Sequence, residues 1–221
     1  MLRVLRFLFW TVLWFVGLSF ALVILYRFVP VPVTATMVMD ENGITKDWTP
    51  LSRIDPNMVA AVIAGEDGKF CEHNGFDREA IEEAIRRNQQ GGRIRGGSSI
   101  SQQTAKNVFL WQGGGYFRKG LEAWFTVLIE QIWGKRRIME VYLNVAEWGA
   151  GIYGAEAAAQ HWFGKSASEL TRTEAARLAA ILPSPRRYQA AEPGPFVRRR
   201  ARSIQAAMGT VRADGLSDCI A

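Results

Sequence analysis

The sequence of 221 residues contains only two cysteines, Cys71 and Cys219, and no fixed-period repeat or low-complexity tract. Two isolated cysteines exclude a dense disulfide scaffold and lack the paired spacing of a zinc site. Whether they pair with each other stays open, because separation along the chain says nothing about distance in space. Without a repeat, a solenoid is disfavoured. The length suits one domain with a sizeable core rather than two large domains.

One long apolar run lies near the N-terminus, from Phe7 to Tyr26. Its length matches the roughly 20 residues that a membrane-spanning helix requires. A cleavable signal peptide is the alternative, but its apolar region would be about 7–15 residues long and would end in small residues. The run here is longer and ends in Tyr26-Arg27-Phe28, and aromatic residues are common at a membrane interface. The sequence therefore predicts a single transmembrane helix.

Positive charge is biased to the N-terminal side of this run. Arg3, Arg6 and the amino terminus precede it, whereas Arg27 alone follows it closely. The positive-inside rule then predicts a cytoplasmic N-terminus, with the rest of the chain outside the cytoplasm. We predict four parts: a cytoplasmic tail at 1–6, a transmembrane helix at 7–28, a linker with a short extended segment at 29–50, and one domain at 51–221.

The net charge of +6 has its excess in short basic runs. These runs are at 86–87, 93–95, 135–137, 186–187 and 198–202. A basic surface favours anionic lipid head groups, pyrophosphates or nucleic acid. The predicted membrane helix makes lipid the better partner, and we expect no nucleic-acid binding. Any one run, taken alone, is more often an ordinary solvated helix face.

Helix signals dominate the rest of the chain. Asp55 followed by Pro56 is an N-cap with proline at the first helical position. Thr171 with Glu174 forms a capping box. Helices are predicted at about 56–64, 77–90, 98–110, 116–133, 135–145, 153–163, 171–183 and 196–208. The predicted fold class is therefore mainly α.

Three stretches in the middle of the chain concentrate carboxylates, amides and cations. They are Glu66-Asp67-Gly68-Lys69-Phe70 with His73, the segment from Gly97 to Asn107, and Arg118-Lys119-Gly120-Leu121-Glu122. Two carboxylates beside cations are what sugar transfer from a phosphorylated donor requires. Each stretch alone has a simpler interpretation: a solvated helix-end acid, helix-capping serines, and a surface ion pair worth about 0.3–0.5 kcal/mol.

Together the three stretches resemble, nearly residue for residue, the signature motifs of the peptidoglycan glycosyltransferases, the transglycosylase domains of penicillin-binding proteins. The nearest likeness is to the monofunctional, membrane-anchored biosynthetic type, and it covers about residues 45–185. The resemblance implies a lysozyme-like helical domain of two lobes with a cleft between them. It also implies an enzyme of the inner membrane, with one N-terminal transmembrane helix and a periplasmic catalytic domain.

The implied reaction joins lipid II into β-1,4-linked glycan strands with inversion and releases undecaprenyl pyrophosphate. By resemblance, Glu66 is the general base that removes the proton from the acceptor 4-hydroxyl, and Glu122 is the second catalytic glutamate. No Ser-x-x-Lys motif occurs in the sequence, so we expect no transpeptidase activity.

The other motif residues divide into two groups by implied role. The substrate-binding group is Asp67, Ser98, Ser99, Gln102, Gln103, Lys106, Arg118, Lys119 and Lys135. Several of these begin a predicted helix, where unpaired amides and the helix dipole favour an anion. Lys106 is the residue that the resemblance assigns to stabilising the departing pyrophosphate. The group expected to shape the site is Phe70, His73, Glu140, Tyr142 and Asn144.

One departure from the family pattern affects the donor site. Several relatives carry an arginine in the loop before the Arg-Lys pair, where this chain has Gly113-Gly114-Gly115. Either Arg93 or Arg95 takes its place, or the site relies on the cations already named. We expect no organic cofactor, and a divalent cation oriented by Glu122 is left open.

The partners implied are lipid II, the growing glycan chain and the membrane, with cell-wall synthesis and division proteins as further possible partners. Two other functions compete with glycan polymerisation. A lysozyme-like lytic enzyme would use water as the acceptor, but an enzyme that cleaves uncharged linkages does not need Lys106, Arg118 and Lys119. A catalytically inactive membrane-tethered scaffold would not need both glutamates.

Overall fold

The computed structural model describes residues 1–89 and 97–220, and most of these residues are helical. The helices are α1 (Leu2–Phe28), α2 (Ala35–Val38), α3 (Pro56–Glu66), α4 (Arg78–Gln89), α5 (Ile100–Phe109), α6 (Gly115–Ile132), α7 (Gly134–Val145), α8 (Ala155–Phe163), α9 (Arg172–Ile181) and α10 (Pro195–Ala213). Short 3-10 turns occur at Leu51–Arg53, Ala167–Glu169 and Asp218–Ile220. The prediction of a mainly α fold with an N-terminal apolar helix is confirmed.

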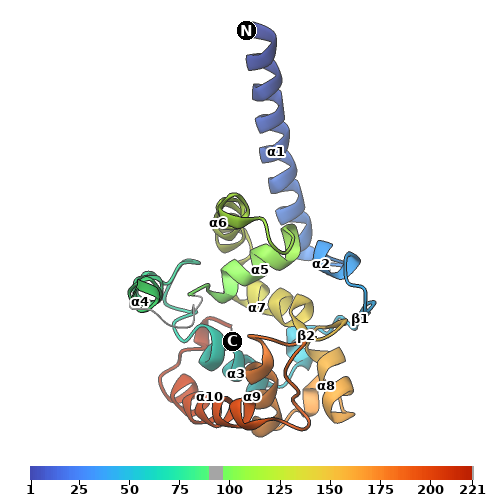
Figure 1. Cartoon of the computed structure of the whole chain (residues 1–221), viewed down its shortest axis with the longest axis vertical. Helices are drawn as coiled ribbons and strands as arrows, with labels where there is room; N and C mark the ends of the chain where they lie inside the picture. The colour runs from blue at the N-terminus through green and yellow to red at the C-terminus, as the bar shows by residue number, and fades with distance from the viewer. Residues whose placement is uncertain (90–96, 221) are drawn as a thin grey trace.

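Helix α1 rises from the rest of the chain and is free of it over its N-terminal half (Figure 1). Its 27 residues are long and apolar enough to cross a membrane. Only Ser19 and Val23 of this helix are buried. The helix begins at Leu2, before the predicted span at Phe7, because no helix-breaking residue separates the two positions.

Two helix starts follow the predicted capping residues. Asp55 accepts a hydrogen bond from the backbone amide two residues farther on, at 2.7 Å, and Pro56 is the first residue of α3. Thr171 and Glu174 form the predicted capping box at the start of α9. These caps satisfy backbone amides that have no partner inside the helix. Both predictions are confirmed.

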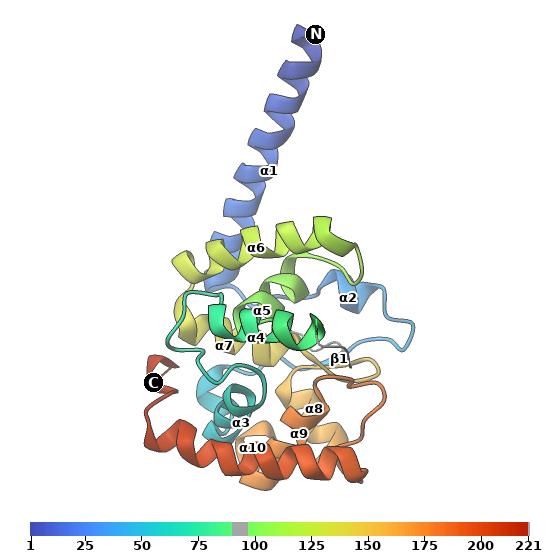
Figure 2. The same ribbon diagram turned by 60° about the vertical axis from the view of Figure 1, so that its left-hand side comes forward.

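Six helices of the domain pack into two groups. Helices α3, α9 and α10 pack on one another at the end farthest from α1, and α5, α6 and α7 pack on one another at the end nearest to it (Figure 2). Helix α3 ends at Glu66 and α5 begins at Ile100, so the first two motif stretches lie where the two groups meet. This arrangement agrees with the predicted two lobes.

A small sheet joins the linker to the domain. Strand β1 (Thr45–Lys46) pairs in parallel with β3 (Ile152–Tyr153), and β2 (Glu147–Gly149) pairs with β3 in antiparallel fashion. The predicted start of a helix at Tyr153 is wrong, because this residue lies in β3 and α8 begins at Ala155. Strands of two or three residues are too short for alternating polarity to reveal them. The short helix α2 was not predicted either.

The C-terminal segment is fastened to the loop that follows α3. Helix α10 extends to Ala213, beyond its predicted end near Met208. Cys71 and Cys219 form a disulfide with their Cα atoms 5.6 Å apart, a pairing that the sequence left open. Their separation of 148 residues means that the bridge restricts a large part of the unfolded chain.

Candidate active site

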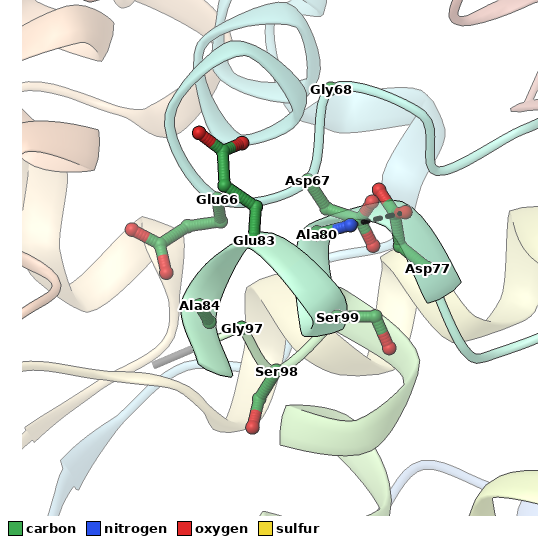
Figure 3. A pocket seen from close by; sticks show the side chains of 10 residues that line it. All are labelled: Glu66, Asp67, Gly68, Asp77, Ala80, Glu83, Ala84, Gly97, Ser98 and Ser99. Carbon is green, nitrogen blue, oxygen red and sulfur yellow. Dashed lines mark hydrogen bonds between the residues drawn. The ribbon is translucent and has the colours of Figure 1, made fainter. Parts of the chain in front are cut away.

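A cavity of about 290 Å³ lies between the end of α3, one side of α4 and the segment that leads into α5 (Figure 3). Glu66, Glu83 and Ser98 line it, one from each of these elements. Asp77 lines it as well and caps α4 by accepting a hydrogen bond from the Ala80 amide at 2.9 Å. The first two motif stretches therefore share one opening in the protein surface.

Glu66 is held by one residue from each group of helices. Its Oε2 accepts a hydrogen bond from Gln103 Nε2 of α5 at 3.1 Å, and its Oε1 accepts one from Arg200 Nη2 of α10 at 3.0 Å. The side chain is only 13% exposed. Burial raises the pKa of the Glu66 carboxyl, while the hydrogen bond from Gln103 and the charge of Arg200 oppose that rise. A carboxylate with a raised pKa is suited to accept a proton in catalysis.

Arg200 was not among the predicted site residues. It also donates a hydrogen bond to the Gly65 carbonyl at 2.9 Å, so it binds the backbone of the last turn of α3 as well as the Glu66 side chain. In the sequence it stands inside a run of arginines that is typical of a solvated helix face. Helical spacing could have indicated that Arg200 points inward. Val197 and Ile204 lie on the buried face of α10, and Arg200 is three residues after the first and four before the second.

Asp67 and His73 build the loop between α3 and α4. Asp67 Oδ2 accepts a hydrogen bond from the Ile100 amide at 2.9 Å, and its Oδ1 lies 2.9 Å from His73 Nε2. Because His73 Nδ1 accepts a hydrogen bond from the Gly75 amide at 3.1 Å, the ring proton is on Nε2 and is donated to Asp67. Asp67, which follows Glu66 in the sequence, therefore connects the end of α3 to the first turn of α5.

The polar residues at the start of α5 divide between helix capping and the site. Ser99 and Gln102 form a capping box, in which the side chain of each accepts from the amide of the other at 3.1 Å. Gln103 instead reaches Glu66, and its Oε1 accepts a hydrogen bond from the Tyr142 hydroxyl at 3.2 Å. Tyr142 is fully buried in α7. This hydroxyl fixes which end of the Gln103 amide faces Glu66.

Glu122 in α6 is buried and surrounded by cations. Arg118 Nη1 donates to its Oε2 at 2.6 Å, and Lys119 Nζ donates to its Oε1. Each carboxylate oxygen thus accepts a hydrogen bond from one cation. Within residues 1–89 and 97–220 there is no group of three or more His, Cys, Asp or Glu side chains that could hold a metal.

A continuous set of contacts links the two glutamates. Lys119 Nζ, which is bound to Glu122, also donates to Ser98 Oγ at 3.1 Å. The Ser98 carbonyl accepts a hydrogen bond from Gln103 Nε2 at 3.3 Å, and the same nitrogen donates to Glu66. The first, second and third motif stretches are therefore joined in one network.

Lys106 lines a second cavity, of about 270 Å³, which Gln103 also lines. Its ammonium makes no hydrogen bond or ion pair with any residue that the structure describes. Burial lowers the pKa of Lys106; the charges of Arg118 and Lys119 lower it further, and that of Glu122 opposes them. A half-buried cation of this kind gains stability when an anion binds beside it.

The glycine segment at 113–115, where the family resemblance leads us to expect an arginine, has a backbone that disfavours other residues. Gly113, Gly114 and Gly115 all have positive φ angles, of 84°, 82° and 55°. A Cβ atom at Gly114 would lie 2.9 Å from the Cβ of Arg118. An arginine at this position would therefore be strained. The two proposed substitutes, Arg93 and Arg95, lie outside the described residues.

The remaining motif residues line neither cavity. Lys135 Nζ donates to Glu130 at 2.7 Å and lies 4.5 Å from the centre of the Phe70 ring. Glu140 accepts a hydrogen bond from a backbone amide at the end of the linker at 3.2 Å. Asn144 makes two hydrogen bonds to the linker backbone, at 2.8 and 2.9 Å. These side chains connect elements around the site.

Comparison with known proteins identifies similar sequences along nearly the whole chain. Residues 34–209 match the sequence profile of a family described as transglycosylase. The chain is 59% identical over 202 residues to a protein of Caulobacter vibrioides named biosynthetic peptidoglycan transglycosylase, covering 90% of this chain and 88% of that protein. It is 51% identical over 218 residues to a protein of the same name from Pseudomonas aeruginosa, covering 95% and 94%. A third, from Rhodospirillum centenum, is 52% identical over 204 residues, covering 90% and 88%.

Proposed function

The chain belongs to the transglycosylase family, and we propose that it is a biosynthetic peptidoglycan glycosyltransferase, like the relatives that carry this name. It joins lipid II units into β-1,4-linked glycan with inversion at the anomeric carbon and releases undecaprenyl pyrophosphate. The observation that carries the proposal is the network from Glu66 to Glu122, which joins a restrained carboxylate to a group of cations. Sugar transfer from a phosphorylated donor needs both.

Glu66 acts as the general base. It takes the proton of the acceptor 4-hydroxyl while that oxygen forms a bond to the anomeric carbon of the donor, and the bond from this carbon to the pyrophosphate breaks. The raised pKa of Glu66 makes it a stronger base than a solvated glutamate. Gln103 and Arg200 hold its two oxygens and favour the ionised form.

The cations stabilise the leaving pyrophosphate. Lys106 has no partner among the described residues, so it is free to contact a phosphate directly. Arg118 and Lys119 are oriented by Glu122, which keeps two positive charges together beside Ser98. Fixed cations in a partly buried site stabilise developing negative charge more strongly than water does.

Asp67, Ser99 and Gln102 stabilise the loop and the helix that carry the site residues. The Asp67 carboxylate pairs with His73 and the Ile100 amide, and the side chains of Ser99 and Gln102 each accept a hydrogen bond from the other's backbone amide. Lys135 likewise pairs with Glu130. We therefore assign these residues to positioning of the loop and helix that carry Glu66 and Gln103, rather than to direct contact with the substrate.

The domain faces a membrane through α6. Helix α1 packs against this helix from Phe15 onward, and both Phe15 and Phe20 contact Trp124. If α1 crosses the bilayer, the exposed Tyr116 and Phe117 of α6 are brought to the membrane surface. The Cys71–Cys219 disulfide supports an oxidising location for the domain, which agrees with a periplasmic catalytic side and a cytoplasmic N-terminus.

The test is polymerisation of fluorescent lipid II by the purified full-length protein, with the products separated on a glycan-resolving gel. We expect polymer from the wild type and almost none from Glu66→Gln. Glu79→Gln is a matched control, because this carboxylate is exposed on α4 and forms an ion pair with Lys69. Absence of polymer together with shortening of preformed glycan would instead establish a lytic enzyme. No change in either substrate would favour the scaffold.

A further inference from the structure

The junction between α1 and the domain is a set of exchanged helix caps. The last carbonyls of a helix have no partner inside it and carry the negative end of the helix dipole. At the end of α1, the carbonyl of Tyr26 accepts hydrogen bonds from Arg137 Nε at 3.0 Å and from Arg137 Nη2 at 2.8 Å. The same Nη2 donates to the Val29 carbonyl at 2.7 Å. One guanidinium of α7 therefore caps the C-terminus of α1.

A second cap runs in the opposite direction, from α1 to α6. Arg27 of α1 donates to the carbonyl of Ile132, the last residue of α6. Between α6 and α7, the indole of Trp133 donates to the Val23 carbonyl at 2.7 Å. Unpaired backbone groups are costly near a bilayer, where water is scarce. These hydrogen bonds therefore favour a state in which α1 stays packed against the domain, over one in which α1 moves freely on the linker.

The guanidinium of Arg137 is itself fixed. Its side chain is 14% exposed and forms an ion pair with Glu140 one turn later on α7. It also lies 5.2 Å from the centre of the Trp48 ring, in the linker. A planar guanidinium can donate to several acceptors in one plane, which a lysine ammonium does not reproduce.

The same helix reaches the reaction site. Tyr142 lies between one and two turns beyond Arg137 on α7, and its hydroxyl holds Gln103, which holds Glu66. The end of the membrane helix and the catalytic carboxylate are therefore connected through one rigid element.

We propose that Arg137, assisted by Trp133, is a positioning residue that clamps the membrane helix to α7 and so fixes the height and orientation of the cleft relative to the bilayer. The inference rests on the proposed function, since it concerns substrates held in the membrane by lipid tails. If the cleft has a fixed height above the bilayer, the reacting groups of the substrates enter it in one orientation. If the domain is loosely tethered, they enter it in many orientations, few of which are reactive.

The test compares glycan synthesis in lipid vesicles and in detergent micelles. We expect Arg137→Gln to lower the rate in vesicles about tenfold and the rate in micelles less than about twofold, because a micelle imposes no fixed height. Arg137→Lys should recover part of the loss. Trp133→Phe, which keeps the ring and removes the N–H donor, should show a smaller loss of the same kind.

Arg136→Gln is the matched control. Arg136 precedes Arg137 on α7 and carries the same charge, but it donates to the Ile220 carbonyl in the C-terminal segment. It should leave the ratio of vesicle to micelle rates unchanged. Equal losses of Arg137→Gln in both media would show a general structural role and overturn the proposal. So would the same vesicle-specific loss in Arg136→Gln.

A second measurement does not depend on activity. Spin labels at Val12→Cys on α1 and Ser203→Cys on α10, both exposed positions, report the distance between anchor and domain in a bilayer. The described residues contain no free cysteine that would compete for the label. We expect one narrow distance distribution in the wild type and a broad one in Arg137→Gln. Equal widths would overturn the clamp, while a wild type that polymerises nothing in either medium would overturn only the proposed function.

Discussion

The end of α3 and the first turns of α6 each supply one glutamate to the same network, yet the two glutamates have different surroundings. Glu66 at the end of α3 borders an open cavity and is held by one neutral amide and one guanidinium. Glu122 in α6 is 2% exposed and has a cation on each oxygen. Burial dominates at Glu66 and raises its pKa.

This difference shows how one residue type serves two tasks. A carboxylate that accepts a proton must be accessible and must have a pKa nearer to neutrality. A carboxylate that gathers cations needs hydrogen-bond donors of opposite charge and no access to the substrate. The surroundings of Glu66 fit the first task and those of Glu122 fit the second.

The largest effect should come from removing the base. We expect Glu66→Gln to lower kcat by about 1,000-fold, within the range of general-base contributions. Its melting temperature should remain close to that of the wild type, because the substitution removes a buried charge whose ionised form is disfavoured by burial. Steady-state polymerisation and thermal unfolding measure the two quantities. A large fall in melting temperature would show that Glu66 is mainly structural.

Glu122→Gln should damage both activity and stability. It leaves Arg118 and Lys119 together without their shared carboxylate, and we expect a loss of about 2–3 kcal/mol in unfolding free energy, reduced from the fully buried case because Lys119 is partly exposed. We expect kcat to fall by about 100-fold as the cations lose their orientation. Urea unfolding and polymerisation assays measure these effects. A variant with wild-type stability and no activity would instead mean that Glu122 takes part in proton transfer.

Arg200→Gln tests the difference between the two glutamates through the pH dependence of the activity. A general base works only when ionised, so with Glu66 as the proposed base we expect activity to be lost as the pH falls through its pKa. Arg200 lowers that pKa, so removing its charge should move the acidic limb of the kcat/KM profile to higher pH. Arg202→Gln, an exposed arginine on the same helix, is the control and should leave the limb in place. An unchanged limb in both variants would show that Arg200 does not act on Glu66.

The sequence could predict the parts of the fold that depend on local signals. The apolar run of α1, the proline after Asp55 and the capping box at Thr171 each act over a few residues, and each predicted element is present. The two-residue strands β1 and β3 could not be predicted, because they pair with each other across more than 100 positions of the chain. The short helix α2 could not be predicted, because it packs on α5, which is also distant in the sequence.

The same limit applies to the site. Family resemblance selected Glu66, Gln103 and the cations from local motifs, and the structure brings them into one network. It missed Arg200 and the clamp at Arg137. In the sequence both residues stand inside runs of basic residues, and only the packing of helices from distant parts of the chain separates an inward arginine from a solvated one.

The smallest effect is expected for Tyr142→Phe, which tests whether Glu66 depends on the hydrogen bond from Gln103. Tyr142→Phe removes only the hydroxyl that fixes the Gln103 amide, so Gln103 can rotate and lose its hydrogen bond to Glu66. We expect kcat to fall about threefold to tenfold and unfolding free energy to fall by about 1 kcal/mol, the usual cost of a lost buried hydrogen bond. Tyr188→Phe is the control, since this ring stacks on Phe196 and lines neither of the two cavities described above. If Tyr142→Phe lowered stability but left kcat unchanged, the orientation of Gln103 would not matter, and Arg200 alone would be sufficient to hold the base.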